Sequence, residues 1–139
     1  MISVSEINKE KVEICFDLDS NSISLWSKKQ WISEFNKEGV KVLALFLSKK
    51  LIGLCVFQVV IDEAQINYFL INQKFRRKGY GSYLMNKLVE KCKILNLKNL
   101  LLEVSEFNLN AEKFYNNFDF LTVGKRKNYY KDGSDALLK

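Results

Sequence analysis

The chain has no histidine, no proline and only three cysteines among its 139 residues. The lack of histidine excludes Ser-His-Asp and Cys-His catalysis and argues against a zinc site. Cys15, Cys55 and Cys92 are far apart and odd in number, a pattern that predicts neither a disulfide framework nor a metal-binding knuckle. We therefore predict no metal. Any general base must be a carboxylate, a tyrosine, a cysteine, a lysine or the backbone acting through water.

Long apolar runs are also missing. No stretch approaches the roughly 18 residues that a membrane-spanning helix needs. Residues 1–6 show neither the basic start nor the apolar core of a signal peptide. The length and the hydrophobic content of 47% are typical of one soluble globular domain. We predict one domain over residues 1–139, acting as a cytoplasmic monomer with no membrane partner.

Acidic residues are outnumbered by basic ones, 16 to 22, which gives a net charge of +6. This excess favours an anionic partner. Nucleic acid, a phosphate-rich cofactor and a ribosomal surface are all compatible with it, because the lysines are spread along the chain. The sequence contains no RNA-binding signature such as an RNP motif, so we predict no specific nucleic-acid partner.

Hydrophobic periodicity and turn residues predict a regular series of elements. The predicted strands are residues 1–7, 40–47, 51–61, 64–71, 100–105, 120–131 and 136–139. The predicted helices are residues 8–19, 83–95 and 108–117, together with one that is capped by Ser27 and ended by Gly39. The order predicts an α/β (α+β) fold in which a central mixed, mostly antiparallel sheet is flanked by helices.

The stretch Arg76-Arg77-Lys78-Gly79-Tyr80-Gly81-Ser82 lies between a predicted strand and a predicted helix. Its two glycines let the backbone approach a ligand closely. The first amides of a helix have no internal partner and lie at the positive end of its dipole, so such a site binds phosphate. The stretch lacks the Gly-Lys-Ser/Thr of a Walker loop, and Leu84 replaces the third glycine of a dinucleotide fingerprint. The alternative is an ordinary basic turn.

Two side chains are candidates for proton transfer. Glu103 lies inside an apolar strand, where its carboxylate should be costly to ionise, so its pKa should rise and suit a general base. The alternative places Glu103 at the rim of the sheet, solvated or paired with a lysine. Tyr115, twelve positions later, could give a proton to a leaving group. The alternative is a core tyrosine between two phenylalanines.

The motif Arg76-x-x-Gly79-x-Gly81 resembles the acyl-CoA pyrophosphate loop of the Gcn5-related N-acetyltransferases. The spacing of Glu103, Asn108, Ala111 and Tyr115 is similar to the second half of that fold. More specifically, the chain resembles the bacterial ribosomal-protein-alanine N-acetyltransferases in Trp26-Ser27, in residues 58–64 and in the tail from residue 126 to residue 136. One departure is Asp119, which replaces the usual glycine before phenylalanine.

The resemblance implies an acetyl-CoA N-acyltransferase fold and direct attack of an amine on the thioester of acetyl-CoA. Glu103 would accept a proton from the substrate ammonium, and Tyr115 would protonate the departing thiolate. The residues expected to bind the cofactor are Phe69, Leu70, Ile71, Arg76, Arg77, Lys78, Gly79, Tyr80, Gly81, Ser82 and Asn108. Tyr129 and Tyr130 would dock the acceptor peptide, although they could also be plain hairpin aromatics.

The acceptor that the resemblance implies is a protein N-terminal α-amine, in particular the N-terminal alanine of a small-subunit ribosomal protein. Two rivals remain open. One is an acetyltransferase that acts on a small-molecule amine, such as a polyamine or an antibiotic, because the fold and the cofactor loop would be the same. The other is a non-catalytic basic module that binds RNA or the ribosome.

Overall fold

The computed structural model describes residues 1–139 except 23, 106–113, 116–117, 119–123, 127–135 and 139. The chain forms two compact units, Met1–Asn99 and Leu100–Lys139. The first unit holds β1 (Ile2–Ile7), η1 (Lys9–Lys11), α1 (Val12–Ser20), α2 (Lys28–Phe35), β2 (Val40–Leu47), β3 (Lys50–Val60), β4 (Glu63–Ile71), η2 (Gln73–Phe75) and α3 (Tyr80–Ile94). Strand β5 (Asn99–Ser105) begins at the boundary, and β6 (Gly124–Arg126) and β7 (Ala136–Leu138) follow. The assignment of residues 1–139 to one domain stays a prediction.

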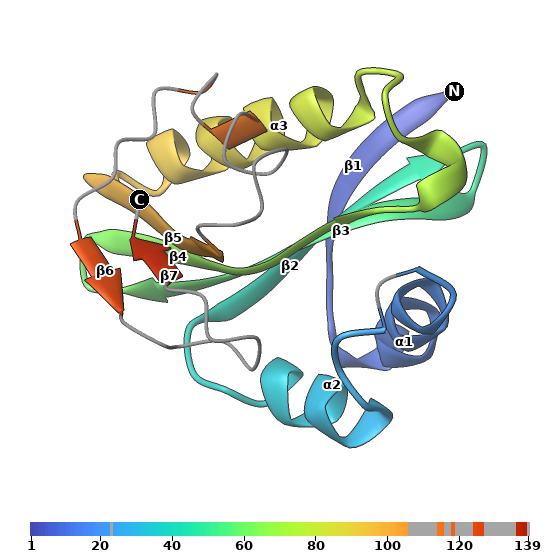
Figure 1. Cartoon of the computed structure of the whole chain (residues 1–139), viewed down its shortest axis with the longest axis horizontal. Helices are drawn as coiled ribbons and strands as arrows, with labels where there is room; N and C mark the ends of the chain where they lie inside the picture. Colours follow the sequence, from blue (N-terminus) through green and yellow to red (C-terminus); the bar gives the residue numbers. More distant parts are fainter. Residues whose placement is uncertain (23, 106–113, 116–117, 119–123, 127–135, 139) are drawn as a thin grey trace. The chain divides into compact units, whose positions relative to one another are not determined.

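Strands β1 to β4 form an antiparallel sheet in chain order (Figure 1). The strands predicted over 40–47, 51–61 and 64–71 are confirmed to within one residue. Ser48 and Lys49 join β2 to β3 with φ of 49° and 73°. Positive φ at both central residues is what a tight two-residue hairpin requires, although glycine and asparagine usually supply it.

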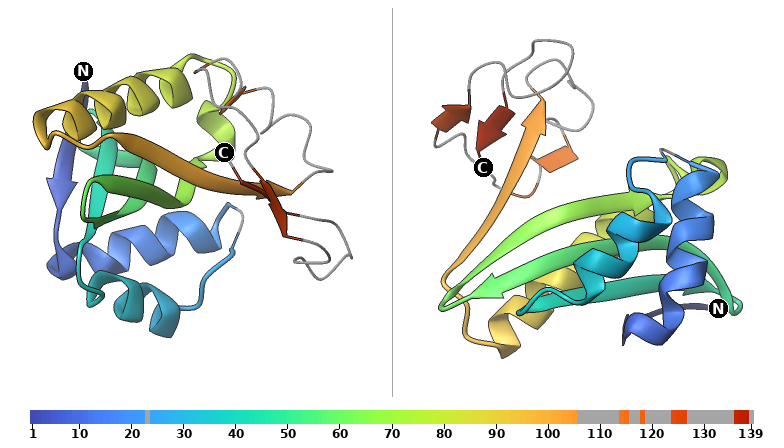
Figure 2. Two further views of the ribbon diagram at one scale, coloured as in Figure 1. Left: turned by 90° about the vertical axis from the view of Figure 1, so that its left-hand side faces the viewer. Right: turned by 90° about the horizontal axis from the view of Figure 1, so that it is seen from below.

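Helices cover both faces of this sheet, with α1 and α2 on one face and α3 on the other (Figures 1 and 2). Strand β3 lies inside the sheet and is buried continuously from Ile52 to Phe57. On the first face, Trp31 of α2 packs into a cluster with residues of α1 and of the sheet. On the second face, α3 buries Leu84, Met85, Leu88 and Cys92. The apolar periodicity of the sequence therefore gives the correct inward face of α3.

The N-terminal cap of α2 is confirmed. The Ser27 hydroxyl accepts a hydrogen bond from the Gln30 amide at 3.1 Å, and the Gln30 side chain accepts one from the Ser27 amide at 2.8 Å. The predicted end of this helix at Gly39 is wrong, because α2 ends at Phe35. Gly39 has a φ of 79°, and a Cβ there would lie 2.4 Å from the Val59 carbonyl oxygen. Glycine is needed at this position for the close approach to β3.

A buried carboxylate connects α1, α2 and β4. Asp19 is fully buried, and it accepts hydrogen bonds from the amides of Leu25 and Trp26 and from the indole of Trp31, at 3.0 to 3.1 Å. It also accepts a hydrogen bond from the hydroxyl of Tyr68 on β4. Burial and the contact with Asp19 raise the pKa of Tyr68 well above its usual range. The network fixes both helices against the strand that leads into the glycine loop.

In the second unit, β7 pairs antiparallel with both β5 and β6. The strand predicted over 100–105 is confirmed, and β6 and β7 lie within the two predicted closing strands. Phe114 and Tyr115 are helical, inside the helix predicted over 108–117, and the rest of that helix lies largely outside the described residues. Within the part of the chain that the structure describes, no helix is long and apolar enough to cross a bilayer.

Candidate active site

Local hydrogen bonds shape the loop between β4 and α3. The Asn72 side chain accepts from the Lys74 amide at 3.0 Å and so caps η2. Arg76 then folds back, and its Nε donates to the Ile71 carbonyl at 3.0 Å. Arg77 and Gly79 adopt left-handed backbone, with φ of 62° and 85°. These contacts turn the chain sharply from the end of β4 into the first turn of α3.

Helix α3 begins at Tyr80, three residues before the predicted start at residue 83. Tyr80, Gly81 and Ser82 carry no apolar periodicity, so the sequence pattern does not reveal this turn. Gly79 is the N-cap, and no side chain caps the helix. The first bond within the helix joins the Tyr83 amide to the Gly79 carbonyl at 3.1 Å. The amides of the three preceding residues therefore have no partner within the helix, and they lie at the positive end of its dipole.

The side of the cap where a Cβ of residue 79 would lie is free of described residues. A Cβ added at Gly79 would meet no atom of the described residues within 4 Å. Arg76, Arg77 and Lys78 are all exposed beside it. Helix amides without a partner, an accessible approach and three positively charged side chains are the features by which proteins bind a diphosphate. The residues present therefore fit a pyrophosphate such as that of acetyl-CoA, and the binding role of 76–82 stays a prediction.

Lys50 is a further cation at this site that the sequence reasoning missed. Its Nζ lies 5.5 Å from the centre of the Phe75 ring, and the Nζ of Lys78 lies 5.9 Å from the same centre. Both distances are within the range of a cation–π contact. The available signal was the antiparallel order of β2, β3 and β4. It places the turn between β2 and β3 at the same end of the sheet as the end of β4.

The end of β4 holds the three residues expected to face the acetyl group and the pantetheine. Phe69, Leu70 and Ile71 pair with residues 55, 54 and 53 of β3. Leu70 is buried, whereas Phe69 and Ile71 are half-buried. A Cβ added at Gly53 would lie 2.6 Å from the Ile71 side chain and 3.1 Å from the Leu70 carbonyl. The absence of a side chain at Gly53 lets β3 hold the end of β4 closely.

The candidate catalytic residues lie in the second unit. Glu103 is in β5, opposite Leu138 of β7. Tyr115 is helical and half-buried, and its ring centre lies 5.4 Å from that of Phe114. Asn108, Tyr129 and Tyr130 lie outside the described residues. The catalytic roles of Glu103 and Tyr115, and the ligand contacts of Asn108 and the two tyrosines, stay predictions.

The three cysteines are poor candidates for the base or nucleophile. All of them are buried and free. Burial raises the pKa of Cys15 to about 12, and it also raises the pKa values of Cys55 and Cys92. A thiol with a raised pKa is protonated at neutral pH and unreactive. Among the described residues there is also no group of three or more side chains able to hold a metal ion.

The model of the acetyltransferase (GNAT) family matches residues 7–120. The chain belongs to the GNAT family of acetyltransferases. The crystal structure of the ribosomal-protein-S18-alanine N-acetyltransferase from Escherichia coli matches with a TM-score of 0.92 and 25% identity. That match covers 99% of this chain and 91% of the other. The predicted acetyl-CoA N-acyltransferase fold is confirmed.

Two further proteins are similar to nearly the whole length of the chain. A Bacillus subtilis protein with a provisional name as a [ribosomal protein bS18]-alanine N-acetyltransferase is 31% identical over 139 residues, which cover 98% of this chain and 92% of that protein. The PaiA N-acetyltransferase of Thermoplasma acidophilum, solved with coenzyme A, shares the fold with a TM-score of 0.76, at 15% identity over 100% of this chain and 98% of that one. This GNAT protein is an acetyl-CoA-dependent N-acetyltransferase, and the family confirms the predicted cosubstrate.

Proposed function

We propose that this enzyme acetylates a protein N-terminal α-amine, specifically the N-terminal alanine of a small-subunit ribosomal protein. The observation that carries the proposal is similarity over nearly the whole chain to proteins named for that acceptor, in sequence and in structure. The same proposal includes a cytoplasmic location without a membrane partner, because ribosomal proteins are made in the cytoplasm. It also includes a monomeric state.

Most of the predicted donor contacts, all except that of Asn108, are assigned to the first unit. The amides of Tyr80, Gly81 and Ser82 would donate hydrogen bonds to the pyrophosphate, and Arg77 and Lys78 would neutralise its charge. The backbone at 69–71 would lie along the pantetheine and the acetyl group. Asn108 would add a contact to the cofactor. This arrangement would leave the thioester carbonyl open to attack by the acceptor.

The second unit would carry the proton transfers. Glu103 takes a proton from the acceptor ammonium through water, which frees the amine lone pair. The amine attacks the acetyl carbonyl carbon, a C–N bond forms and the C–S bond breaks, and the nitrogen gives its second proton to water. The hydroxyl of Tyr115 gives its proton to the departing thiolate. Tyr129 and Tyr130 would hold the acceptor peptide. No covalent enzyme intermediate forms, and a chain without histidine suits this mechanism.

The test supplies acetyl-CoA and a short peptide with a free N-terminal alanine, taken from the ribosomal candidate, and follows thiol release. An α-blocked copy of the peptide and spermidine serve as parallel acceptors. We expect release with the free peptide alone. Release with spermidine alone would keep the fold and the donor but refute the ribosomal acceptor. Equal release with the blocked peptide would refute transfer to the α-amine.

A further inference from the structure

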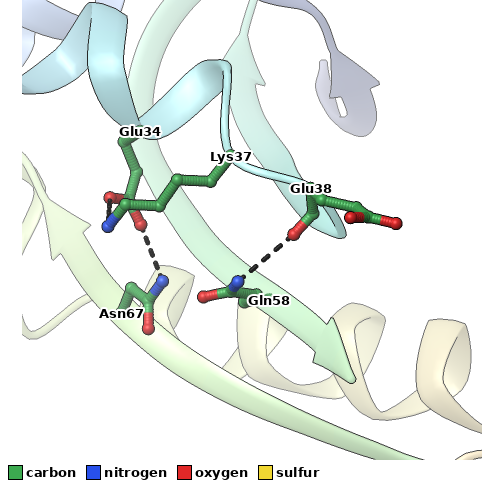
Figure 3. Close-up of polar contacts among 5 residues, drawn as sticks. All are labelled: Glu34, Lys37, Glu38, Gln58 and Asn67. Atoms are coloured by element: carbon green, nitrogen blue, oxygen red, sulfur yellow. Dashed lines mark hydrogen bonds and ion pairs between the residues drawn. The ribbon is translucent and has the colours of Figure 1, made fainter. Parts of the chain in front are cut away.

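Glu34 is a buried carboxylate on α2 to which the proposed reaction gives no role. The residue is 5% exposed. One oxygen of its carboxylate accepts a hydrogen bond from Asn67 Nδ2 at 2.7 Å, and the other lies 2.7 Å from Lys37 Nζ (Figure 3). Both oxygens thus have a partner, which offsets the cost of burying the charge. Through these contacts Glu34 connects α2 directly to β4.

Asn67 occupies a special position in β4. Tyr68 pairs with Val56 and Ile66 pairs with Phe57, so Asn67 has no opposite residue in β3. This is a β-bulge, which bends a strand and changes the direction of the residues around it. The strand segment that follows the bulge is 69–71, the predicted acetyl-binding segment. The side chain that fixes the bulged residue is the carboxylate of Glu34 (Figure 3).

We infer that Glu34 and Asn67 form a positioning pair that sets the bulge of β4 and so orients the backbone at 69–71 toward the acetyl group. The inference rests on the proposed role of 69–71 in donor binding. The loop that follows β4 is shaped by contacts outside 69–71, such as the hydrogen bond from the Lys74 amide to the Asn72 side chain. Losing the pair should therefore misorient the reacting group while the nucleotide end of the donor stays bound.

The expected effect is a split between kcat and KM. Asn67→Asp replaces the N–H donor by a second carboxylate, so the hydrogen bond to Glu34 is lost and the two ionised groups repel each other. We expect kcat to fall by roughly 10- to 100-fold, since a misplacement of about 1 Å can cost about 100-fold. The KM for acetyl-CoA should change by less than about threefold, because the phosphate contacts remain.

The double variant Glu34→Gln/Asn67→Asp restores the hydrogen bond with donor and acceptor exchanged. Glu34→Gln alone keeps an acceptor for Asn67 and serves as the conservative variant. We expect the double variant to regain most of the lost kcat, which is the non-additivity of two side chains in contact. An Asn67→Asp defect that Glu34→Gln does not relieve would overturn the inference.

Gln58→Ala provides the matched control. Gln58 Nε2 donates to the Glu38 carbonyl at 3.2 Å, so it links the segment that follows α2 to the sheet, but from β3 and through a hydrogen bond that involves neither Glu34 nor Asn67 (Figure 3). We expect Gln58→Ala to keep the wild-type kcat even where it lowers the thermal midpoint. A fall in kcat equal to that of Asn67→Asp would identify the pair as ordinary packing and overturn its positioning role.

Hydrogen exchange tests the pair without acetyl transfer. In Asn67→Asp we expect faster amide exchange at 69–71 than in the wild type, and recovery in the double variant. An unchanged exchange rate at 69–71 would refute the inference whatever the activity. If the wild-type protein transferred acetyl to none of the acceptors, the proposed function would fail instead. The exchange result would still decide whether Glu34 sets the bulge.

Discussion

At the scale of single residues, Gly79 combines two requirements. Its φ of 85° is a conformation that L residues with a Cβ adopt only at a cost. Among the residues that the structure describes, a Cβ added here would contact no atom within 4 Å. The open side is where the donor pyrophosphate is expected. Backbone strain and ligand exclusion can therefore be separated by experiment at this one position.

Gly79→Ala should lower the free energy of unfolding by about 1 kcal/mol, from the cost of left-handed backbone. It should also raise the KM for acetyl-CoA by about tenfold or more, because the added methyl group occupies the approach to the uncapped amides. Denaturant unfolding without ligand measures the first effect, and steady-state kinetics measures the second. A KM equal to that of the wild type would show that the phosphate does not bind over Gly79.

Glu103 and Tyr115 are assigned to single proton transfers. Glu103→Gln and Tyr115→Phe should each lower kcat by about 10²- to 10⁴-fold, the usual contribution of a general base or acid. The KM for acetyl-CoA should be nearly constant. Glu103→Gln should also remove the rise of kcat with pH that a carboxylate base produces. If both variants kept a kcat near the wild type, the assignment of these two roles would be wrong.

At the scale of elements, the hairpin between β2 and β3 supplies Lys50 to a loop more than twenty positions away in the sequence. Lys50→Gln should raise the KM for acetyl-CoA several-fold, roughly 2- to 10-fold for the loss of one exposed cation near a phosphate. The effect should shrink as salt is added. Lys29→Gln, on the exposed side of α2, is the control. An equal effect at Lys29 would indicate a general loss of positive charge.

The elements also show what the sequence could reveal. Strands β2 to β4 were predictable because long apolar stretches are separated by short polar turns. The turn between β4 and α3 was predictable because its glycine spacing and its charge are local features. The start of α3 at Tyr80 was not, since glycine and serine in its first turn do not signal a helix. The bond from Glu34 to Asn67 joins positions 33 apart and depends on a bulge, which no local pattern encodes.

At the scale of the whole molecule, the burial of weakly acidic side chains makes the free energy of unfolding depend on pH in the alkaline range. Burial is the principal cause of the raised pKa values of Cys15, Cys55, Cys92 and Tyr68. In the unfolded chain these groups return to ordinary values, 9.0 for a cysteine and 10.0 for a tyrosine. The unfolded chain therefore loses protons at a lower pH than the folded protein does.

The sign of the pH dependence follows directly. Below about pH 9 both states are protonated at these groups, so they add no pH dependence. As pH rises above 9, the unfolded state is stabilised by ionisation, and the free energy of unfolding should fall steadily toward pH 12, where Cys15 titrates in the folded protein. Urea unfolding followed by circular dichroism at about pH 8, 9.5 and 11 measures this decline.

Cys55→Ala should flatten the decline, because one buried thiol is removed. A midpoint that stays constant from pH 8 to pH 11 in the wild type would contradict the burial of these four groups.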